Sequence, residues 1–257
     1  MTTQVTSTSN SKGQYTLWQI LAIWLAGGAP MWMLGWVAYP ALSAGLPSLD
    51  AGLLRLRLFT VGLIWEFVLA MFILYREEGN IRLGTIRRRF WLNHPVSART
   101  GETKKVLWWW IVPLILLLAF LEMGFRRPLT DLWTAILPFL AEPKGYNITS
   151  MFTPELHAQI VGDWGLLGLF FALSLFNTFL GEEFLFRGVL LPKMKGVFGN
   201  WDWVANGVIF GFYHLHQPCG ILSDILGGGY LPSPANAFTA TGSPSSCIPD
   251  RAYCFCF

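Results

Sequence analysis

The sequence predicts an all-α protein, a multi-pass transmembrane helical bundle. Of its 257 residues, 53% are hydrophobic and only 13% are charged, which is little charge for a soluble domain. Its 13 tryptophans and 20 phenylalanines suit the aromatic belts at the two faces of a lipid bilayer. Several apolar stretches approach or exceed the roughly 20 residues that cross the hydrocarbon core as a helix. No internal repeat is visible, so one membrane-embedded unit is expected.

This unit is expected over residues 15–227, after a disordered polar tail at residues 1–14 that is rich in Ser and Thr. The first apolar stretch, residues 15–38, predicts a membrane helix with a kink at Pro30. After a connector at residues 40–57, a second span is expected at 58–75. Glu66 interrupts that span, and because a carboxyl group is costly in lipid, it should face the bundle interior or a cavity.

A basic segment follows at residues 76–105, and it is rich in arginine. By the positive-inside rule this loop lies in the cytoplasm, where it can contact anionic membrane lipids. Residues 106–123 predict a third span, and a short amphipathic helix is expected at 129–140. Residues 164–191 predict a fourth helix that returns to the cytoplasm, and residues 201–215 start the next one. We therefore expect a plasma-membrane protein. The net charge of +3 is small, and no stretch resembles a nucleic-acid groove.

The candidate chemistry begins with two adjacent glutamates, Glu182 and Glu183. Neighbours on a helix point about 100° apart, so these carboxyl groups cannot share one proton face to face. Glu183 and Arg187 are spaced i, i+4 and can pair. That pairing leaves Glu182 free to face a cavity as a general base. The alternative is purely structural: both glutamates pair with Arg187 and hold two helices together.

Two histidines, His214 and His216, lie on the following helix. Residues two apart on a regular helix face nearly opposite sides, so the pair is not expected to bind one metal ion. A single interior histidine is as often a hydrogen-bonded structural group as a catalytic one. Phe210 and Phe212 are candidates for the wall of an apolar substrate groove. The sequence contains no HExxH, GxSxG or CxxC motif, so zinc-protease, serine-hydrolase and zinc-ribbon chemistries are not supported.

Two short motifs then indicate a family. EEFLFR at 182–187 matches EExxxR, and FGFYH at 210–214 matches FxxxH. The chain resembles the CPBP intramembrane proteases, which group CAAX prenyl endopeptidases with bacteriocin-processing and self-immunity proteins. The resemblance covers residues 164–227 and implies an endopeptidase whose active site is open towards the cytoplasm. Its substrate would be a peptide or a prenylated protein.

Carried over by position, the resemblance makes Glu182 the base that activates water. Glu183 and Arg187 would complete the first motif, and His214 would orient the water. No metal ligand is assigned, although the family is often labelled metalloprotease and a divalent metal is left open. The alternatives are a non-catalytic membrane scaffold, a self-immunity protein, or a small transporter whose buried acids move protons.

The chain departs from this family after His216. The family's third motif supplies a later histidine that stabilises the oxyanion, and no histidine follows here. Losing an oxyanion donor costs on the order of 100- to 1000-fold in rate, so activity of this form is left open. Residues 228–257 are rich in Pro, Ser, Ala and Cys and show no helical or strand period. We hypothesise that this aberrant tail reflects a truncation or frameshift, which the nucleotide sequence tests; the alternative is an ordinary disordered tail.

Overall fold

A computed structural model describes residues 13–90, 109, 111–143, 146, 154 and 161–229. All regular elements in these ranges are helical, which confirms the all-α class. The predicted tails lie almost entirely outside them, so the predictions of disorder, truncation and frameshift stay predictions. The α-helices are α1 (Leu17–Met33), α2 (Tyr39–Ser43), α3 (Ser48–Glu78), α4 (Leu83–Arg89), α5 (Ile111–Ile136), α7 (Trp164–Leu175), α8 (Leu191–Met194), α9 (Asp202–Tyr213) and α10 (Ile221–Gly229). The π-helices are η1 (Leu34–Ala38), η5 (Phe176–Leu180) and η6 (Glu183–Leu190), and short 3₁₀ turns are η3 (Pro138–Leu140), η7 (Gly199–Trp201), η8 (His214–His216) and η9 (Pro218–Gly220).

The first two long helices are longer than the sequence predicted. Thr16 caps α1 through a reciprocal hydrogen-bond pair with Gln19, and the helix continues through the π-turn η1 into α2. Pro40 lies in the first turn of α2, directly after the π-turn. The connector expected at 40–57 is therefore wrong: only a short loop separates α2 from α3. In the described part of the chain, Leu17–Ser43 and Ser48–Glu78 are the helices long and apolar enough to cross a membrane.

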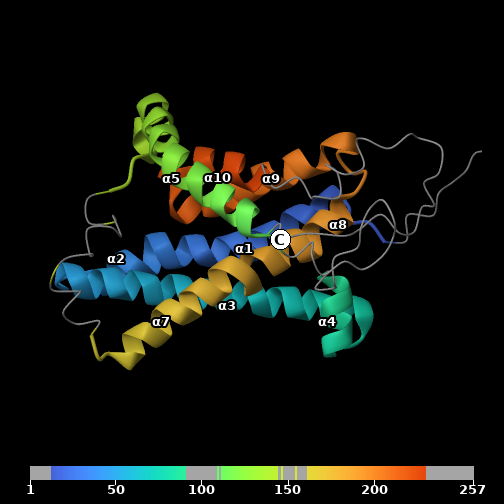
Figure 1. Ribbon diagram of the computed structural model, residues 1–257, viewed down its shortest axis with the longest axis horizontal. Helices are drawn as coiled ribbons and strands as arrows, with labels where there is room; N and C mark the ends of the chain where they lie inside the picture. Colours follow the sequence, from blue (N-terminus) through green and yellow to red (C-terminus); the bar gives the residue numbers. More distant parts are fainter. Residues whose placement is uncertain are drawn as a thin grey trace, which may run out of the picture.

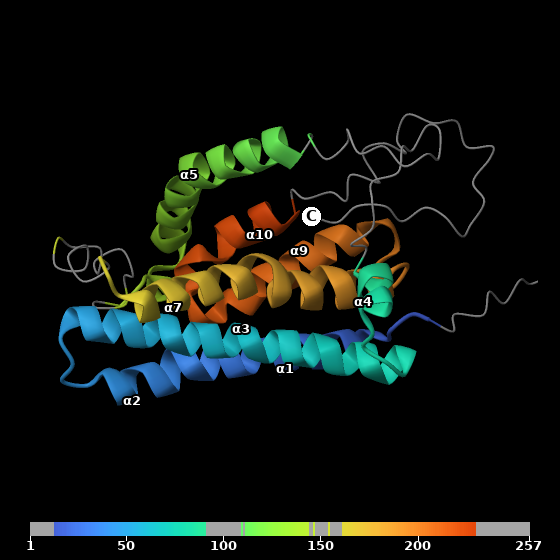
Figure 2. The same ribbon diagram turned by 60° about the horizontal axis from the view of Figure 1, so that its bottom comes forward.

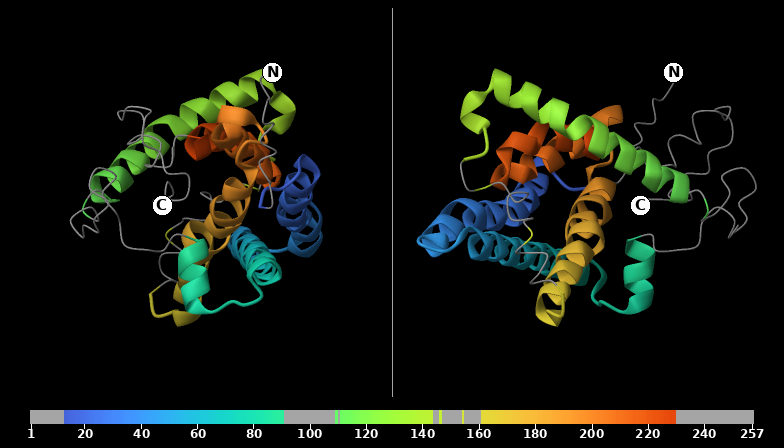
Figure 3. Two further views of the ribbon diagram at one scale, coloured as in Figure 1. Left: turned by 90° about the vertical axis from the view of Figure 1, so that its right-hand side faces the viewer. Right: turned by 60° about the vertical axis from the view of Figure 1, so that its left-hand side comes forward.

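Helix α5 differs most from its prediction. The sequence placed a span before residue 124 and a separate amphipathic helix at 129–140, with Gly124 and Pro128 in the break. Instead, α5 is continuous from Ile111 to Ile136, with Pro128 inside it. It bends in its middle (Figure 2), as expected where a proline removes a helical hydrogen bond. Helix α5 lies on the outside of the bundle, against α10 (Figure 3).

The other long helices form the body of the molecule. Helix α1 packs on α3, α7 crosses α3, and α9 lies against both α1 and α10 (Figure 1). Their shared core is made of large apolar side chains. It includes Ile20, Met31, Phe59, Leu63, Leu185, Phe186 and Tyr213. Glu66 is 0% exposed within this core, so the expectation that it faces the interior is confirmed.

Tryptophan indoles join α1 to α9, and η1 to the turn η8 that follows α9. The Nε1–H of Trp24 donates to the carbonyl of Ile209 at 2.8 Å. The Nε1–H of Trp36 donates to the carbonyl of Leu215, also at 2.8 Å. An apolar ring with one polar edge can satisfy a carbonyl inside an apolar bundle. These two bonds position the end of α9 and the turn that follows it.

Glu77 ties several segments together at the end of α3. Its carboxylate accepts a hydrogen bond from the hydroxyl of Tyr15, and pairs with Arg89 at 2.9 Å and Lys193 at 3.3 Å. Arg89 also donates to the carbonyl of Gly188 in η6 at 2.9 Å. The segment before α1, the short helix α4 and the region after η6 are therefore linked through one carboxylate.

We expect Glu77→Gln to lower the free energy of unfolding by about 1–3 kcal/mol, because it leaves several partly buried donors without their charged acceptor. Glu78→Gln is the matched control, since Glu78 is next to Glu77 in the sequence and its ion pair is with Arg88, whose side chain is 67% exposed. An exposed pair is worth roughly 0–1 kcal/mol. Thermal unfolding of both variants in detergent measures the difference. Equal shifts in Tm for the two variants would contradict the central role of Glu77.

Candidate active site

The segment that carries the two glutamates is not a regular α-helix. It consists of the π-helices η5 and η6, separated by Gly181 and Glu182. π-Helical turns are rare and occur frequently at functional sites. A Cβ atom on Gly181 would lie 2.8 Å from the carbonyl oxygen of Phe176 and 2.9 Å from that of Leu63. Glycine thus allows this segment to approach the backbone of α3 just before Glu182.

Glu183 and Arg187 pair as the i, i+4 spacing predicts. Nη1 of Arg187 lies 2.5 Å from Oε1 of Glu183, and the arginine side chain is 8% exposed. The guanidinium also lies over the ring of Phe210, 4.6 Å from its centroid. Arg187 therefore links η6 to α9. This contact holds the glutamate-bearing and histidine-bearing segments next to each other.

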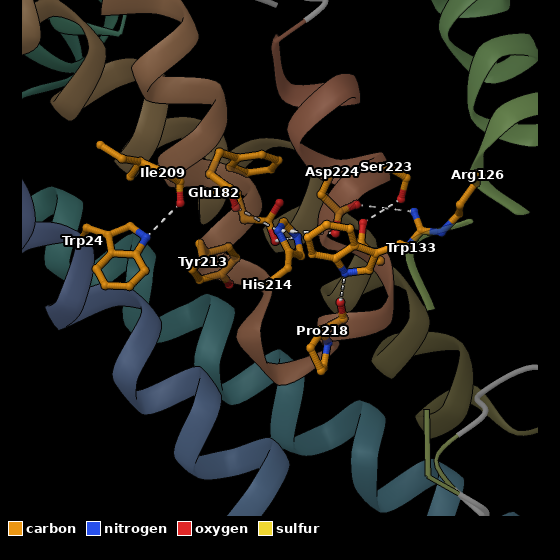
Figure 4. Close-up of polar contacts among 12 residues, drawn as sticks. Trp24, Arg126, Trp133, Glu182, Ile209, Tyr213, His214, Pro218, Ser223 and Asp224 are labelled. Carbon is orange, nitrogen blue, oxygen red and sulfur yellow. Dashed lines mark hydrogen bonds and ion pairs between the residues drawn. The ribbon is translucent and has the colours of Figure 1, made fainter. Parts of the chain in front are cut away.

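Glu182 meets His214 from the other segment. Oε1 of Glu182 lies 3.8 Å from Nε2 of His214, and Glu182 is 8% exposed. The other ring nitrogen, Nδ1, lies 3.0 Å from the carbonyl oxygen of Phe210. Because a carbonyl only accepts hydrogen bonds, this contact places a proton on Nδ1. In the neutral ring, Nε2 then presents a lone pair towards the Glu182 carboxyl group (Figure 4).

A cavity of about 270 Å³ lies at this contact. Glu182, His214 and Phe210 all line it, as their candidate roles require. Glu183 and Arg187 do not line it and instead pack beside it. Phe212 does not line it either and is 42% exposed, so its place in a substrate groove stays a prediction. The full lining is Met31, Phe59, Leu63, Arg126, Leu173, Asn177, Glu182, Phe210, His214, His216, Gln217 and Asp224.

His214 and His216 lie close together, contrary to the sequence expectation. That expectation assumed a regular helix, in which residues two apart diverge. Helix α9 ends at Tyr213, and His214–His216 form a 3₁₀ turn. The centroids of the two imidazole rings are 5.5 Å apart, and both residues line the cavity.

Sequence reasoning missed two charged residues of this site, Asp224 and Arg126. Oδ2 of Asp224 lies 3.7 Å from Nδ1 of His214, and Oδ1 lies 3.8 Å from Nη1 of Arg126 (Figure 4). A Cβ atom on Gly211 would lie 2.2 Å from Cγ1 of Ile225, so α10 packs tightly on α9 and brings Asp224 to His214. Asp224 could have been identified from the sequence, because it is an acidic residue within the short apolar run of α10. The sequence holds no comparable signal for Arg126.

Glu66 completes the buried polar groups near the cavity. Its carboxyl group is hydrogen-bonded to the hydroxyl of Tyr213, the residue before His214. Among the residues that the structure describes, no group of three or more His, Cys, Asp or Glu side chains is arranged to hold a metal ion. We therefore assign no step to a metal.

The described residues thus bring a carboxyl group and an imidazole to one cavity, in a protein with two helices long and apolar enough to cross a membrane. Residues 163–244 match the family model of the type II CAAX prenyl endopeptidase Rce1-like proteins. This match confirms the recognition of a CPBP-type protease sequence and indicates a CAAX-protease-like membrane endopeptidase. It contains both motifs and continues past residue 227, but it covers less than half of the chain. Comparisons with curated proteins and with solved structures found no match.

Proposed function

We propose that this protein is an intramembrane endopeptidase that hydrolyses peptide bonds with a water molecule activated by Glu182 and oriented by His214. The observation that carries the proposal is the 3.8 Å separation of Glu182 Oε1 and His214 Nε2 inside a cavity. That distance is too long for a direct hydrogen bond. It suits one water molecule that donates one hydrogen to the carboxylate and one to the imidazole.

The chemistry follows from these two acceptors. Glu182 takes a proton from the water as the water oxygen forms a bond to the carbonyl carbon, and the carbonyl π electrons move to oxygen. When the tetrahedral intermediate collapses, the C–N bond breaks and Glu182 returns the proton to the leaving nitrogen. The products are a carboxylic acid and an amine. His214 is held for this task by the carbonyl of Phe210 and by Asp224.

The proposed substrate is a peptide or prenylated protein that reaches the site from the membrane. The cavity wall is partly apolar, with Met31, Leu63 and Phe210 among its residues. We propose that the protein resides in the plasma membrane and that the site opens towards the cytoplasm. Helix α4, which ends in three consecutive arginines, supports this orientation through the positive-inside rule.

The test is cleavage of fluorogenic peptides, with and without a prenyl group, by the purified protein in liposomes. We expect His214→Ala to lower kcat by about 100-fold, in the range of general acid–base contributions. Leu215→Ala is the matched control, because that side chain is 37% exposed and does not line the cavity. Unchanged cleavage by folded His214→Ala protein would overturn the role of His214. Absence of cleavage by the unmodified protein would favour a non-catalytic membrane scaffold instead.

A further inference from the structure

His216 is a buried imidazole in the cavity wall that the proposed mechanism does not yet use. It is 6% exposed and is fixed by rings on several sides. Its ring lies edge-on to Phe59 with centroids 4.9 Å apart, and 5.7 Å from the ring of Tyr213. The π-helix η1 packs against it, because a Cβ atom on Gly35 would lie 3.1 Å from Cβ of His216. The ring therefore has a defined orientation.

The two ring nitrogens of His216 differ in what they can do. Nδ1 is enclosed and has no hydrogen-bond partner among the described residues. This leaves Nε2 as the nitrogen available to a molecule in the cavity. In the neutral tautomer that carries its proton on Nε2, this nitrogen is a hydrogen-bond donor. A buried donor needs a partner, and a carbonyl oxygen of a bound peptide would supply one.

Peptide hydrolysis needs such a donor, because the carbonyl oxygen becomes negatively charged when water adds. Arg126, Asn177 and Gln217 also line the cavity and could donate. Arg126 is paired with Asp224, on the side of that residue away from His214 (Figure 4). Asn177 is exposed and Gln217 is only partly buried. Donors in a water-excluded site stabilise an oxyanion best, which favours the enclosed imidazole beside His214.

We propose that His216 is a second catalytic histidine, which donates a hydrogen bond from Nε2–H to the scissile carbonyl oxygen. The bond strengthens as the carbonyl π electrons move onto that oxygen, and the proton stays on Nε2 throughout. When the intermediate collapses, the C=O bond re-forms as the C–N bond breaks. This role rests on the proposed function. The two imidazoles then act on different molecules: His214 orients the water, and His216 donates a hydrogen bond to the carbonyl oxygen of the substrate.

We expect His216→Ala to lower kcat by about 100-fold, the usual effect of removing one oxyanion donor, with a much smaller change in KM. A peptide aldehyde, whose hydrate mimics the tetrahedral intermediate, should bind this variant more weakly by a similar factor. Added imidazole should restore part of the activity, which a purely structural loss would not permit. His216→Gln, which keeps an amide donor and more of the volume, should retain more activity and serves if His216→Ala does not fold.

Unchanged kcat in folded His216→Ala protein would overturn the role of His216. A loss of activity that neither imidazole nor glutamine restores, with unchanged aldehyde affinity, would overturn it as well. Glu182→Gln, assayed in parallel, separates this outcome from failure of the proposed function. If Glu182→Gln is inactive while the His216 variants match the unmodified protein, only the oxyanion role fails. If Glu182→Gln cleaves normally, the proposed function itself is wrong.

Discussion

Glu182→Gln is expected to lower kcat by about 10,000-fold, the upper end of the range for a general base. The amide has the shape of the carboxylate and can still accept a hydrogen bond from water, but it cannot take up the proton. The side chain is buried next to His214, and no other carboxylate among the described residues has the same contact with Nε2 of that ring. Substrate binding should change little, so KM should remain within a few fold.

The measurement is single-turnover cleavage of a saturating peptide in liposomes, together with the Tm of each protein. Glu78→Gln makes the same chemical change at an exposed ion pair far along α3 and should leave kcat unaltered. A loss below about tenfold in folded Glu182→Gln protein would show that this carboxylate is not the base.

Gly181→Ala is expected to reduce both stability and cleavage. The added Cβ would meet two backbone carbonyl oxygens, those of Phe176 and Leu63, at 2.8 and 2.9 Å. Backbone atoms cannot rotate away as a side chain does, so the segment must shift from α3. Overpacking of this kind costs about 1–3 kcal/mol. The shift also moves Glu182, and a misplacement of about 1 Å can cost on the order of 100-fold in rate.

Gly168→Ala is the matched control on α7, because a Cβ atom there meets nothing within 4 Å. That variant should keep its kcat and gain up to about 1 kcal/mol, since alanine is the better helix former. Stability from thermal unfolding and kcat from the peptide assay are measured for both variants. Equal behaviour of Gly181→Ala and Gly168→Ala would contradict the tight approach of the π-helical segment to α3.

Several parts of this site were predictable because they depend on local spacing or on the cost of burying charge. The Glu183–Arg187 pair follows from i, i+4 geometry, and the interior position of Glu66 follows from the cost of a carboxyl group in lipid. The meeting of Glu182 with His214 was predicted from the depth of two successive apolar helices. In the structure, Oε1 of Glu182 lies 3.8 Å from Nε2 of His214. The catalytic roles of the two residues are proposals.

Other parts were not predictable because they depend on where a helix changes its form. The place of His216 follows from the 3₁₀ turn that begins at His214, and a regular helix would have turned its ring away. The continuity of α5 through Pro128 contradicts the usual preference of proline for a helix start. Helix α5 packs against α10 and η9, so its continuation through Pro128 occurs together with contacts to other parts of the fold.

The amino-acid order alone determined the helical class, the presence of two long apolar helices in the first third of the chain, and the two motifs that carry the acids and the imidazole. These properties depend on composition and on neighbours within a few residues, so they are visible before any folding. Tertiary structure decided which polar groups share the cavity: Asp224 is brought to His214 by the close packing of α10 on Gly211, and Phe212 is turned outward. Such contacts join residues on different helices, and only the packing of complete side chains specifies them.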